Sequence, residues 1–269
     1  EDKSLARILI PNQEGYLKYV DTDNNSADFG EQEPSPKFKN SSSYSDLDDD
    51  GIIDSFDSTT TISMDIELEP GEYLFKDLVI TNGANLVLKG DPNLAGFKGV
   101  KISAQNLTIE QNCSLNSDKQ GYLEPMILER NFYSPQILGS GGKGNPRLAS
   151  CHPMRGGVGG GAMILEIANT LEVQGRISAN GEDGLGLSPL LSFGCVATVA
   201  GEGGSIYINT NILKGNGNIT ANGGNGYNRS KLGKGGQIVA HYEDNFAFGG
   251  EIHSFGGERS GNYASPGTV

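Results

Sequence analysis

The chain has 269 residues, of which 40 are glycine, and its net charge is −13. This charge argues against nucleic acid and anionic membrane surfaces as partners, because both bind through cationic side chains. The glycines lack the three-residue period of collagen, hydrophobic residues at 36% are too frequent for simple disorder, and no apolar run approaches the ~20 residues of a membrane-spanning helix.

Residues 1–58 are predicted to be an irregular acidic segment without a core of its own, because they are rich in Ser, Pro and Asp. Between Asp21 and Asp57 there are eleven acidic residues and two lysines, which gives a local net charge of −9. The acidity of the protein is therefore concentrated in this segment. Such a local cluster of carboxylates favours the binding of a cation.

A calcium-binding loop is predicted within this segment, from Asp46 to Asp57. Calcium prefers six to eight oxygen ligands on a flexible loop, and Gly51 permits the sharp turn that such a loop needs. β-Branched residues rather than a helix follow the loop, so the motif resembles a thrombospondin type 3 calcium repeat more than an EF-hand. A solvated acidic linker is the alternative interpretation. The predicted metal ligands are Asp46, Asp48, Asp50, the carbonyl of Ile52, Asp54 and Asp57.

From residue 59 to residue 269 the sequence predicts short strands separated by turns. TTTISMDIELEPGEYLFKDLVITNGANLVLKG is rich in β-branched and aromatic residues and is interrupted by Pro-Gly and Asn-Gly. The pattern then repeats from Val100, Gly161, Gly203 and Gly235, and each copy holds a strand, a turn and a second strand. The second strands align on Leu115, Ile177, Ile219 and Ile252.

A repeat of about 20–25 residues with two or three short strands predicts an all-β fold. The predicted fold is a right-handed parallel β-helix (β-solenoid) with long glycine-rich inserts at its corners. Stacked copies would place isoleucines over one another in a continuous core. Gly and Asn at the corners would supply the positive φ that sharp turns need. An antiparallel β-sandwich is the competing fold.

The phrases GGSIYI, GNITANGG and GKGGQIVAHY resemble the glycine-rich parallel β-helix repeats of large secreted and cell-surface proteins, which are mostly bacterial. The resemblance covers residues 71–269 and implies a right-handed parallel β-helix in an extracellular setting. In that family the final phrase ASPGTV normally continues into another strand, so we expect the chain to be truncated at Val269.

Other motifs indicate no chemistry. The three cysteines have no metal-like spacing, and Cys151 and Cys195 could form a disulfide, which would leave Cys113 over. The histidines are His152, His241 and His253; the last two lie on neighbouring predicted strands, but a surface position is the simpler interpretation. No catalytic residues and no organic cofactor are predicted, and calcium is the only expected cofactor.

The resulting hypothesis is a non-enzymatic, extracellular structural or adhesive module of a cell-surface, fibre or matrix protein, stabilised by calcium. Its expected partners are other domains or copies of the same surface protein, with carbohydrate as a further candidate. The alternatives are a polysaccharide-binding or polysaccharide-cleaving protein and a subunit of a self-assembling filament. Uronate release, electron microscopy and calcium chelation distinguish them.

Overall fold

The architecture is taken from a computed structural model. It describes residues 4–7, 9–11, 17–19, 29–32, 59–94, 97–125, 137–142, 155–184, 198–226, 231–243 and 247–269. These residues form strands, turns and extended segments without a helix, which confirms the predicted all-β class. Within the same residues no helix is long and apolar enough to cross a membrane.

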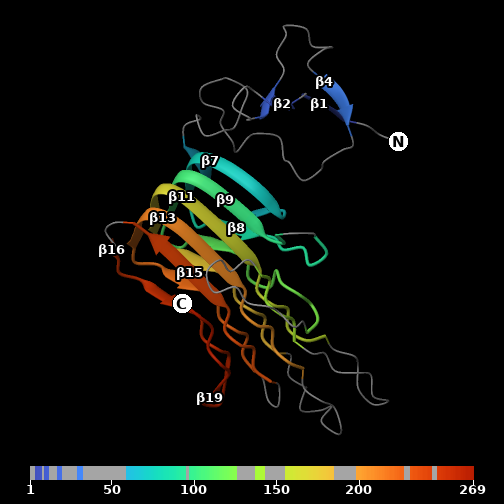
Figure 1. Ribbon diagram of the computed structural model, residues 1–269, viewed down its shortest axis with the longest axis vertical. Coiled ribbons are helices and arrows are strands. Elements are labelled where there is room, and N and C mark those ends of the chain that lie inside the picture. Colours follow the sequence, from blue (N-terminus) through green and yellow to red (C-terminus); the bar gives the residue numbers. More distant parts are fainter. Residues whose placement is uncertain are drawn as a thin grey trace.

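Two parallel sheets form the centre of the fold (Figure 1). The larger sheet has the order β15-β13-β11-β9-β7-β5, with β16 beside β13, and the smaller has the order β17-β14-β12-β10-β8-β6. The larger sheet consists of β5 (Thr60–Ile62), β7 (Gly71–Ile80), β9 (Val100–Ile109), β11 (Ala162–Val173), β13 (Ser205–Gly215), β15 (Gln237–Tyr242) and β16 (Ala247–Phe248). The smaller sheet consists of β6 (Ile66–Leu68), β8 (Asn85–Leu88), β10 (Ser114–Asn116), β12 (Arg176–Ser178), β14 (Asn218–Thr220) and β17 (Glu251–His253).

The chain alternates between the two sheets: β5, β7, β9, β11 and β13 are each followed directly by a short strand of the smaller sheet, and β15 is followed by β16 and then by β17. The connections are tight turns, and positive φ angles occur in them at Asn82, Gly83, Asn112 and Gly215. Asn and Gly adopt this backbone conformation at the lowest cost, so the sequence prediction for these turns is correct. Longer glycine-rich segments lead from β10, β12 and β14 back to the larger sheet.

The core lies between the two sheets and consists of apolar rows that run across the strands. The predicted alignment of the short strands is confirmed, because Leu115 pairs with Ile177, Ile177 with Ile219, and Ile219 with Ile252. The first three of these side chains are fully buried, and Ile252 is partly buried at the edge strand. Each fully buried Leu or Ile contributes about 1.5–3 kcal/mol through the hydrophobic effect.

The predicted right-handed parallel β-helix is wrong as a description of this fold. The described residues form two parallel sheets of seven and six strands, stacked on one another, rather than regular coils closed on every side. The physical reason lies in the glycine-rich segments, which run away from the sheets and pair with one another instead of turning tight corners (Figure 1). The competing antiparallel sandwich is also excluded, because every pairing within the two sheets is parallel.

Three short antiparallel pairs complete the described strands. β1 (Ser4–Arg7) pairs with β4 (Phe29–Gln32), and β2 (Leu9–Pro11) pairs with β3 (Leu17–Tyr19). Both pairs lie within residues 1–58, for which the sequence predicts an irregular acidic segment. Near the C-terminus β18 (Glu258–Arg259) and β19 (Asn262–Tyr263) form a hairpin around Ser260 and Gly261, both of which have positive φ.

Candidate functional site: a bundle of glycine-rich segments

Extended glycine-rich segments lie side by side beyond the ends of the sheets (Figure 1). The outgoing segments follow β10, β12, β14 and β17 and comprise residues 117–122, 179–184, 221–226 and 254–258. The return segments comprise residues 155–161, 198–204, 231–236 and 264–268, and segment 137–142 is an additional member. We call these nine segments the glycine bundle.

The hydrogen bonds of the glycine bundle repeat every three residues. The amide of Gly204 donates to the carbonyl of Ala179, and three residues further along the amide of Gly201 donates to Glu182, at 2.7 and 2.8 Å. A polyproline II helix has three residues per turn and no internal hydrogen bonds, so residues three apart face the same neighbour. The same three-residue spacing recurs in the next two pairs of segments. The amides of Gly236 and Gly233 donate to the carbonyls of Ala221 and Gly224, and those of Gly267 and Ala264 donate to the carbonyls of Ser254 and Gly257. The segments therefore pack as polyproline II-type chains that bond to one another.

Each glycine-rich segment hydrogen-bonds to neighbours on several sides. In the outgoing segment 221–226, the amide of Gly224 donates to the return-segment carbonyl of Gly201, whereas the amides of Gly223 and Gly226 donate to the next outgoing segment. Backbone polar groups in a region with few side chains are thereby paired with other backbone groups. The glycine bundle is held together by main-chain bonds rather than by an apolar core.

Glycine is required in the bundle because the backbones approach too closely for a side chain. A Cβ atom at Gly204 would lie 1.8 Å from the carbonyl oxygen of Gly161, and one at Gly160 would lie 2.1 Å from that of Ala179. Neither Gly204 nor Gly160 has a positive φ. The prediction that glycines in these segments supply positive φ at corners is therefore wrong, and close backbone contact is the reason for them instead.

Asparagine and aspartate side chains form a ladder across the outgoing segments. The Oδ1 atom of Asp118 accepts the amide of Asn180 at 2.6 Å, and Oδ1 of Asn180 accepts the amide of Asn222 at 2.7 Å. Oδ1 of Asn222 then accepts the amide of Phe255 at 2.7 Å. A second ladder, three residues further along, runs from Asp183 through Asn225 to Glu258. Sequence reasoning missed this role, although the in-register ISANG and ITANGGNG phrases carry its signal.

An ion pair ties a return segment to an outgoing one at Glu182. Its carboxylate pairs with the Arg155 guanidinium and also accepts the amide of Val158 at 3.0 Å. The hydrogen bond from Arg155 holds the pKa of Glu182 below its ordinary value, although partial burial of the carboxyl opposes this shift. The carboxylates of Glu182 and Asp183 therefore both hold neighbouring segments together.

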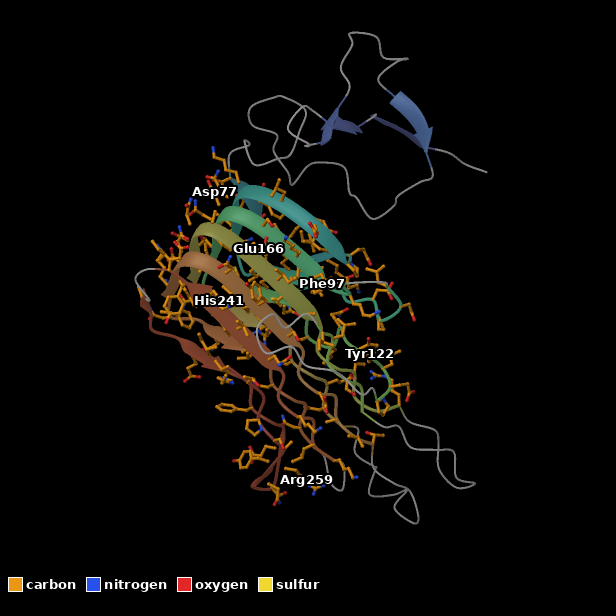
Figure 2. All side chains as sticks on the ribbon, in the orientation of Figure 1. Asp77, Phe97, Tyr122, Glu166, His241 and Arg259 are labelled. Atoms are coloured by element: carbon orange, nitrogen blue, oxygen red, sulfur yellow. The ribbon has the colours of Figure 1, made fainter. Side chains whose placement is uncertain are left out.

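The outward face of the larger sheet carries charged rows in register. The Nζ atom of Lys101 lies 2.9 Å from the carboxylate of Glu166, and that of Lys214 lies 2.9 Å from Glu172. The hydrogen bond that Lys214 donates to Glu172 lowers the pKa of Glu172, and the one that Lys101 donates to Glu166 raises the pKa of Lys101. Figure 2 shows Glu166 and His241 on this sheet, and Asn209 joins them in one cross-strand row. These exposed pairs stabilise the face only weakly.

The predicted calcium ligands lie outside the described residues, and so do Cys151, Cys195 and His152. The structure thus does not test the calcium site or the disulfide. Cys113 is a buried free thiol that packs in the core. Within the part of the chain that the structure describes, no group of three or more His, Cys, Asp or Glu side chains is placed to hold a metal ion.

His241 and His253 contact different aromatic partners in different sheets. The His241 ring on β15 lies 5.6 Å from that of Tyr207, and the His253 ring on β17 stacks on Phe255 at 4.3 Å. His253 also hydrogen-bonds through Nδ1 to Asn222, at 3.1 Å. The structure therefore gives the two histidines separate surroundings rather than one shared site.

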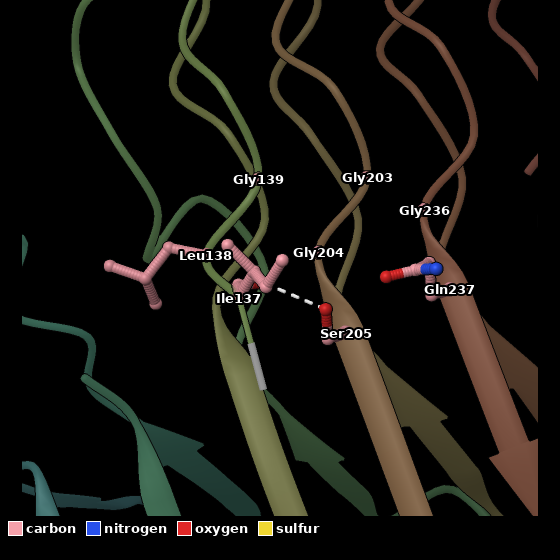
Figure 3. Close-up of a pocket in the computed structure, with 8 residues that line it drawn as sticks. All are labelled: Ile137, Leu138, Gly139, Gly203, Gly204, Ser205, Gly236 and Gln237. Atoms are coloured by element: carbon pink, nitrogen blue, oxygen red, sulfur yellow. Dashed lines mark hydrogen bonds between the residues drawn. The ribbon is translucent and has the colours of Figure 1, made fainter. Parts of the chain in front are cut away.

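A small cavity of about 10 Å³ lies where the glycine bundle meets the larger sheet (Figure 3). It is lined by Ile137, Leu138, Gly139, Gly203, Gly204, Ser205, Gly236 and Gln237. The hydroxyl of Ser205 donates to the carbonyl of Ile137 at 2.7 Å. Gln237 is 3% exposed, and its Nε2 atom has no hydrogen-bond partner among the described residues. This cavity has room for about one water molecule.

No family model, no curated protein and no solved structure matches this chain.

Proposed function

We propose that the chain is an extracellular structural or adhesive module of a cell-surface, fibre or matrix protein. The observation that supports this proposal is the glycine bundle, in which main-chain contacts join segments far apart in the sequence. A bundle without room for a Cβ atom is resistant to rearrangement, because any shift breaks several hydrogen bonds together. Such rigidity suits a module that bears load or presents a surface.

The outer end of the glycine bundle gathers chain segments that are distant in sequence. Gly141 bonds to Glu124 there, Gly184 to Asn225, and Gly226 to Glu258. These residues flank the stretches of sequence that begin after residues 125, 142, 184 and 226. Rigid scaffolds that bring distant parts of a sequence together are a common basis for recognition surfaces. The arrangement supports an adhesive role.

Calcium is the proposed stabilising ion, bound by Asp46, Asp48, Asp50, Ile52, Asp54 and Asp57. The support is the sequence spacing of five carboxylates and one backbone carbonyl around Gly51. The test is the melting temperature in calcium and in excess chelator. We expect chelator to lower the wild-type value, and the double variant Asp48→Asn/Asp50→Asn to melt alike in both conditions. Asp23→Asn is the matched control and should keep the response.

Adhesion is tested with beads that carry the purified chain. We expect these beads to attach to surfaces coated with extracellular polysaccharide or with the same chain, in calcium, and to release no uronate from acidic glycans. Uronate release would overturn the structural role in favour of a polysaccharide-cleaving enzyme. Attachment equal to that of beads coated with an unrelated acidic protein would overturn the adhesive role.

Carbohydrate binding is the second candidate function, and one observation favours it. Phe255 is 60% exposed and its ring stacks flat on His253, with an interplanar angle of 14°. An exposed rigid aromatic surface suits the apolar face of a sugar ring. The test is a glycan-binding assay with Phe255→Ala, and Tyr263→Ala is the control because Tyr263 is also an exposed aromatic residue, at 69%. This candidate requires that only Phe255→Ala reduces binding.

A further inference from the structure

Segment 137–142 is held in the glycine bundle by hydrogen bonds with return segments 155–161 and 198–204 and with β13. The amide of Gly139 donates to the carbonyl of Gly160 at 2.7 Å, and the amide of Glu202 donates to the carbonyl of Ser140 at 2.9 Å. The Ser205 hydroxyl donates to the carbonyl of Ile137 at 2.7 Å, as Figure 3 shows. Segment 137–142 thus lies over the groove between return segments 155–161 and 198–204.

Three groups hold segment 137–142: the Gly160 carbonyl, the Glu202 amide and the Ser205 hydroxyl. Their counterparts recur one strand further along the stack. Ala162 pairs with Ser205, and Ser205 pairs with Gln237. In this register Gln237 takes the position of Ser205. Gly203, two residues before Ser205, corresponds to Gly160, and Lys234, three residues before Gln237, corresponds to Glu202. The backbone bonds agree with this register, because the amide of Gly160 donates to Glu202 as the amide of Gly203 donates to Lys234. The groove between 198–204 and 231–236 therefore repeats the geometry of the occupied one.

In this second groove the three groups have no partner among the described residues. The Nε2 atom of Gln237 is buried and unbonded. The carbonyl of Gly203 and the amide of Lys234 make no hydrogen bond within the described chain, whereas their counterparts hold segment 137–142. A buried donor without an acceptor is costly, and its cost is removed when a ligand supplies the acceptor. The cavity beside Ile137 lies at this point.

The groove also restricts what can enter it. In segment 137–142, a Cβ atom at Gly139 would lie 2.6 Å from the carbonyl of Glu202 and 2.7 Å from that of Gly203. The corresponding position of a second occupant faces Lys234 in place of Glu202 and must be glycine for the same reason. The carbonyl two residues before that glycine would accept a hydrogen bond from the Gln237 side chain, as the Ile137 carbonyl accepts one from the Ser205 hydroxyl.

We propose that this groove binds an extended, glycine-rich peptide segment of a partner polypeptide, laid alongside 137–142. The ligand would accept a hydrogen bond from Gln237 and one from the Lys234 amide, and would donate one to the Gly203 carbonyl. This inference goes beyond the proposed function. Peptide binding in this groove does not depend on whether the chain is a structural or adhesive module.

The test uses a capped hexapeptide, Ile-Leu-Gly-Ser-Gly-Gly, titrated into the isotope-labelled full chain and followed by NMR. We expect saturable shifts at the Lys234 amide and the Gln237 side-chain NH₂, at about millimolar affinity. The same peptide with alanine at its first glycine should not bind. Gln237→Met keeps the side-chain length but removes the donor, and should weaken binding about two- to tenfold.

Two results would overturn this proposal. One is the absence of saturable shifts at Lys234 and Gln237 in a chain whose amide spectrum shows it to be folded. The other is binding that is equal for the glycine and alanine peptides, or unchanged by Gln237→Met. Gln237→Leu provides a second variant without the donor if Gln237→Met does not fold. A crystal structure grown with the peptide that shows only a water molecule at Nε2 would also count against the proposal.

Discussion

The two sheets and the glycine bundle are stabilised in opposite ways. In the sheets, rows such as Leu107, Leu171 and Leu213 bury their side chains fully between the layers. In the bundle, glycine backbones contact one another directly, with few buried apolar side chains such as Leu138 and Val158. Side-chain packing drives the first region, and main-chain hydrogen bonding at close approach holds the second.

This difference predicts different sensitivities to mutation. A core row loses stability when a side chain becomes smaller, because a cavity remains. The bundle loses stability when a side chain becomes larger by a single methyl group, because backbone atoms already fill the space. The two modes of stabilisation can therefore be distinguished by large-to-small substitutions in the core and by glycine-to-alanine substitutions in the bundle.

The largest effect is expected from truncation in the core. Leu165 is fully buried on β11 between its neighbours on β9 and β13. Leu165→Ala should lower the free energy of unfolding by about 2–5 kcal/mol, through lost burial and a residual cavity. Urea denaturation measures this change. Leu74→Ala is the control, since Leu74 is 41% exposed, and its effect should stay within about 0.5 kcal/mol.

The next effect is expected from a single added methyl group in the bundle. Gly204→Ala would place a Cβ atom 1.8 Å from the Gly161 carbonyl and should destabilise the chain by about 3 kcal/mol. Hydrogen exchange should show lost protection at the amides of Gly204 and Gly236 before the amides of β9 are affected. Gly71→Ala is the control, because its Cβ has no neighbour closer than 3.8 Å. Equal destabilisation by both changes would contradict the close-packing argument.

The sequence was sufficient to predict the strand register and the turns but not the architecture. The repeated second strands aligned correctly on Leu115 and Ile177 because apolar side chains must stack on one another in a parallel sheet. The turn at Asn82-Gly83 was predicted correctly because few residues other than Asn and Gly adopt its positive φ angles. Local patterns of this kind are encoded by single residues and their neighbours.

The glycine bundle was not predictable, because the same composition permits two explanations. Gly204 looks like a corner glycine in the sequence, and only its neighbour Gly161 in space shows that the space for a Cβ is absent. Asn180 and Asn222 likewise look like turn residues, whereas their side chains accept amides from adjacent segments. These roles depend on contacts between segments about 40 residues apart, which local propensity does not contain.

The Asn ladder should contribute less to the free energy of unfolding than the close glycine contacts do, but more than the surface ion pairs. Asn222→Ala removes the acceptor of the Phe255 amide and should lower the free energy of unfolding by about 1.5 kcal/mol, because that N–H loses its hydrogen-bond partner. Asn222→Asp retains the acceptor oxygen and is the matched control. The measurement is the exchange rate of the Phe255 amide together with the melting temperature. The ladder has no structural role if the alanine and aspartate variants behave alike.

The smallest effect concerns the pH dependence of the ion pair between Glu182 and Arg155. The pKa of Glu182 is lower in the folded chain than its ordinary value of 4.5, so the pair stabilises the fold above that pH and loses its contribution as the pH falls through the folded value. Glu182→Gln keeps an oxygen for the Val158 amide but removes the charge, and should cost about 1 kcal/mol at pH 7. At pH 3 the difference between the variant and the wild type should be smaller than at pH 7, because the contribution of the pair decreases as the pH falls below the ordinary value of 4.5. Urea denaturation at both values measures this difference, and a cost that is the same at pH 3 and pH 7 would show that the packing of the side chain matters rather than its charge.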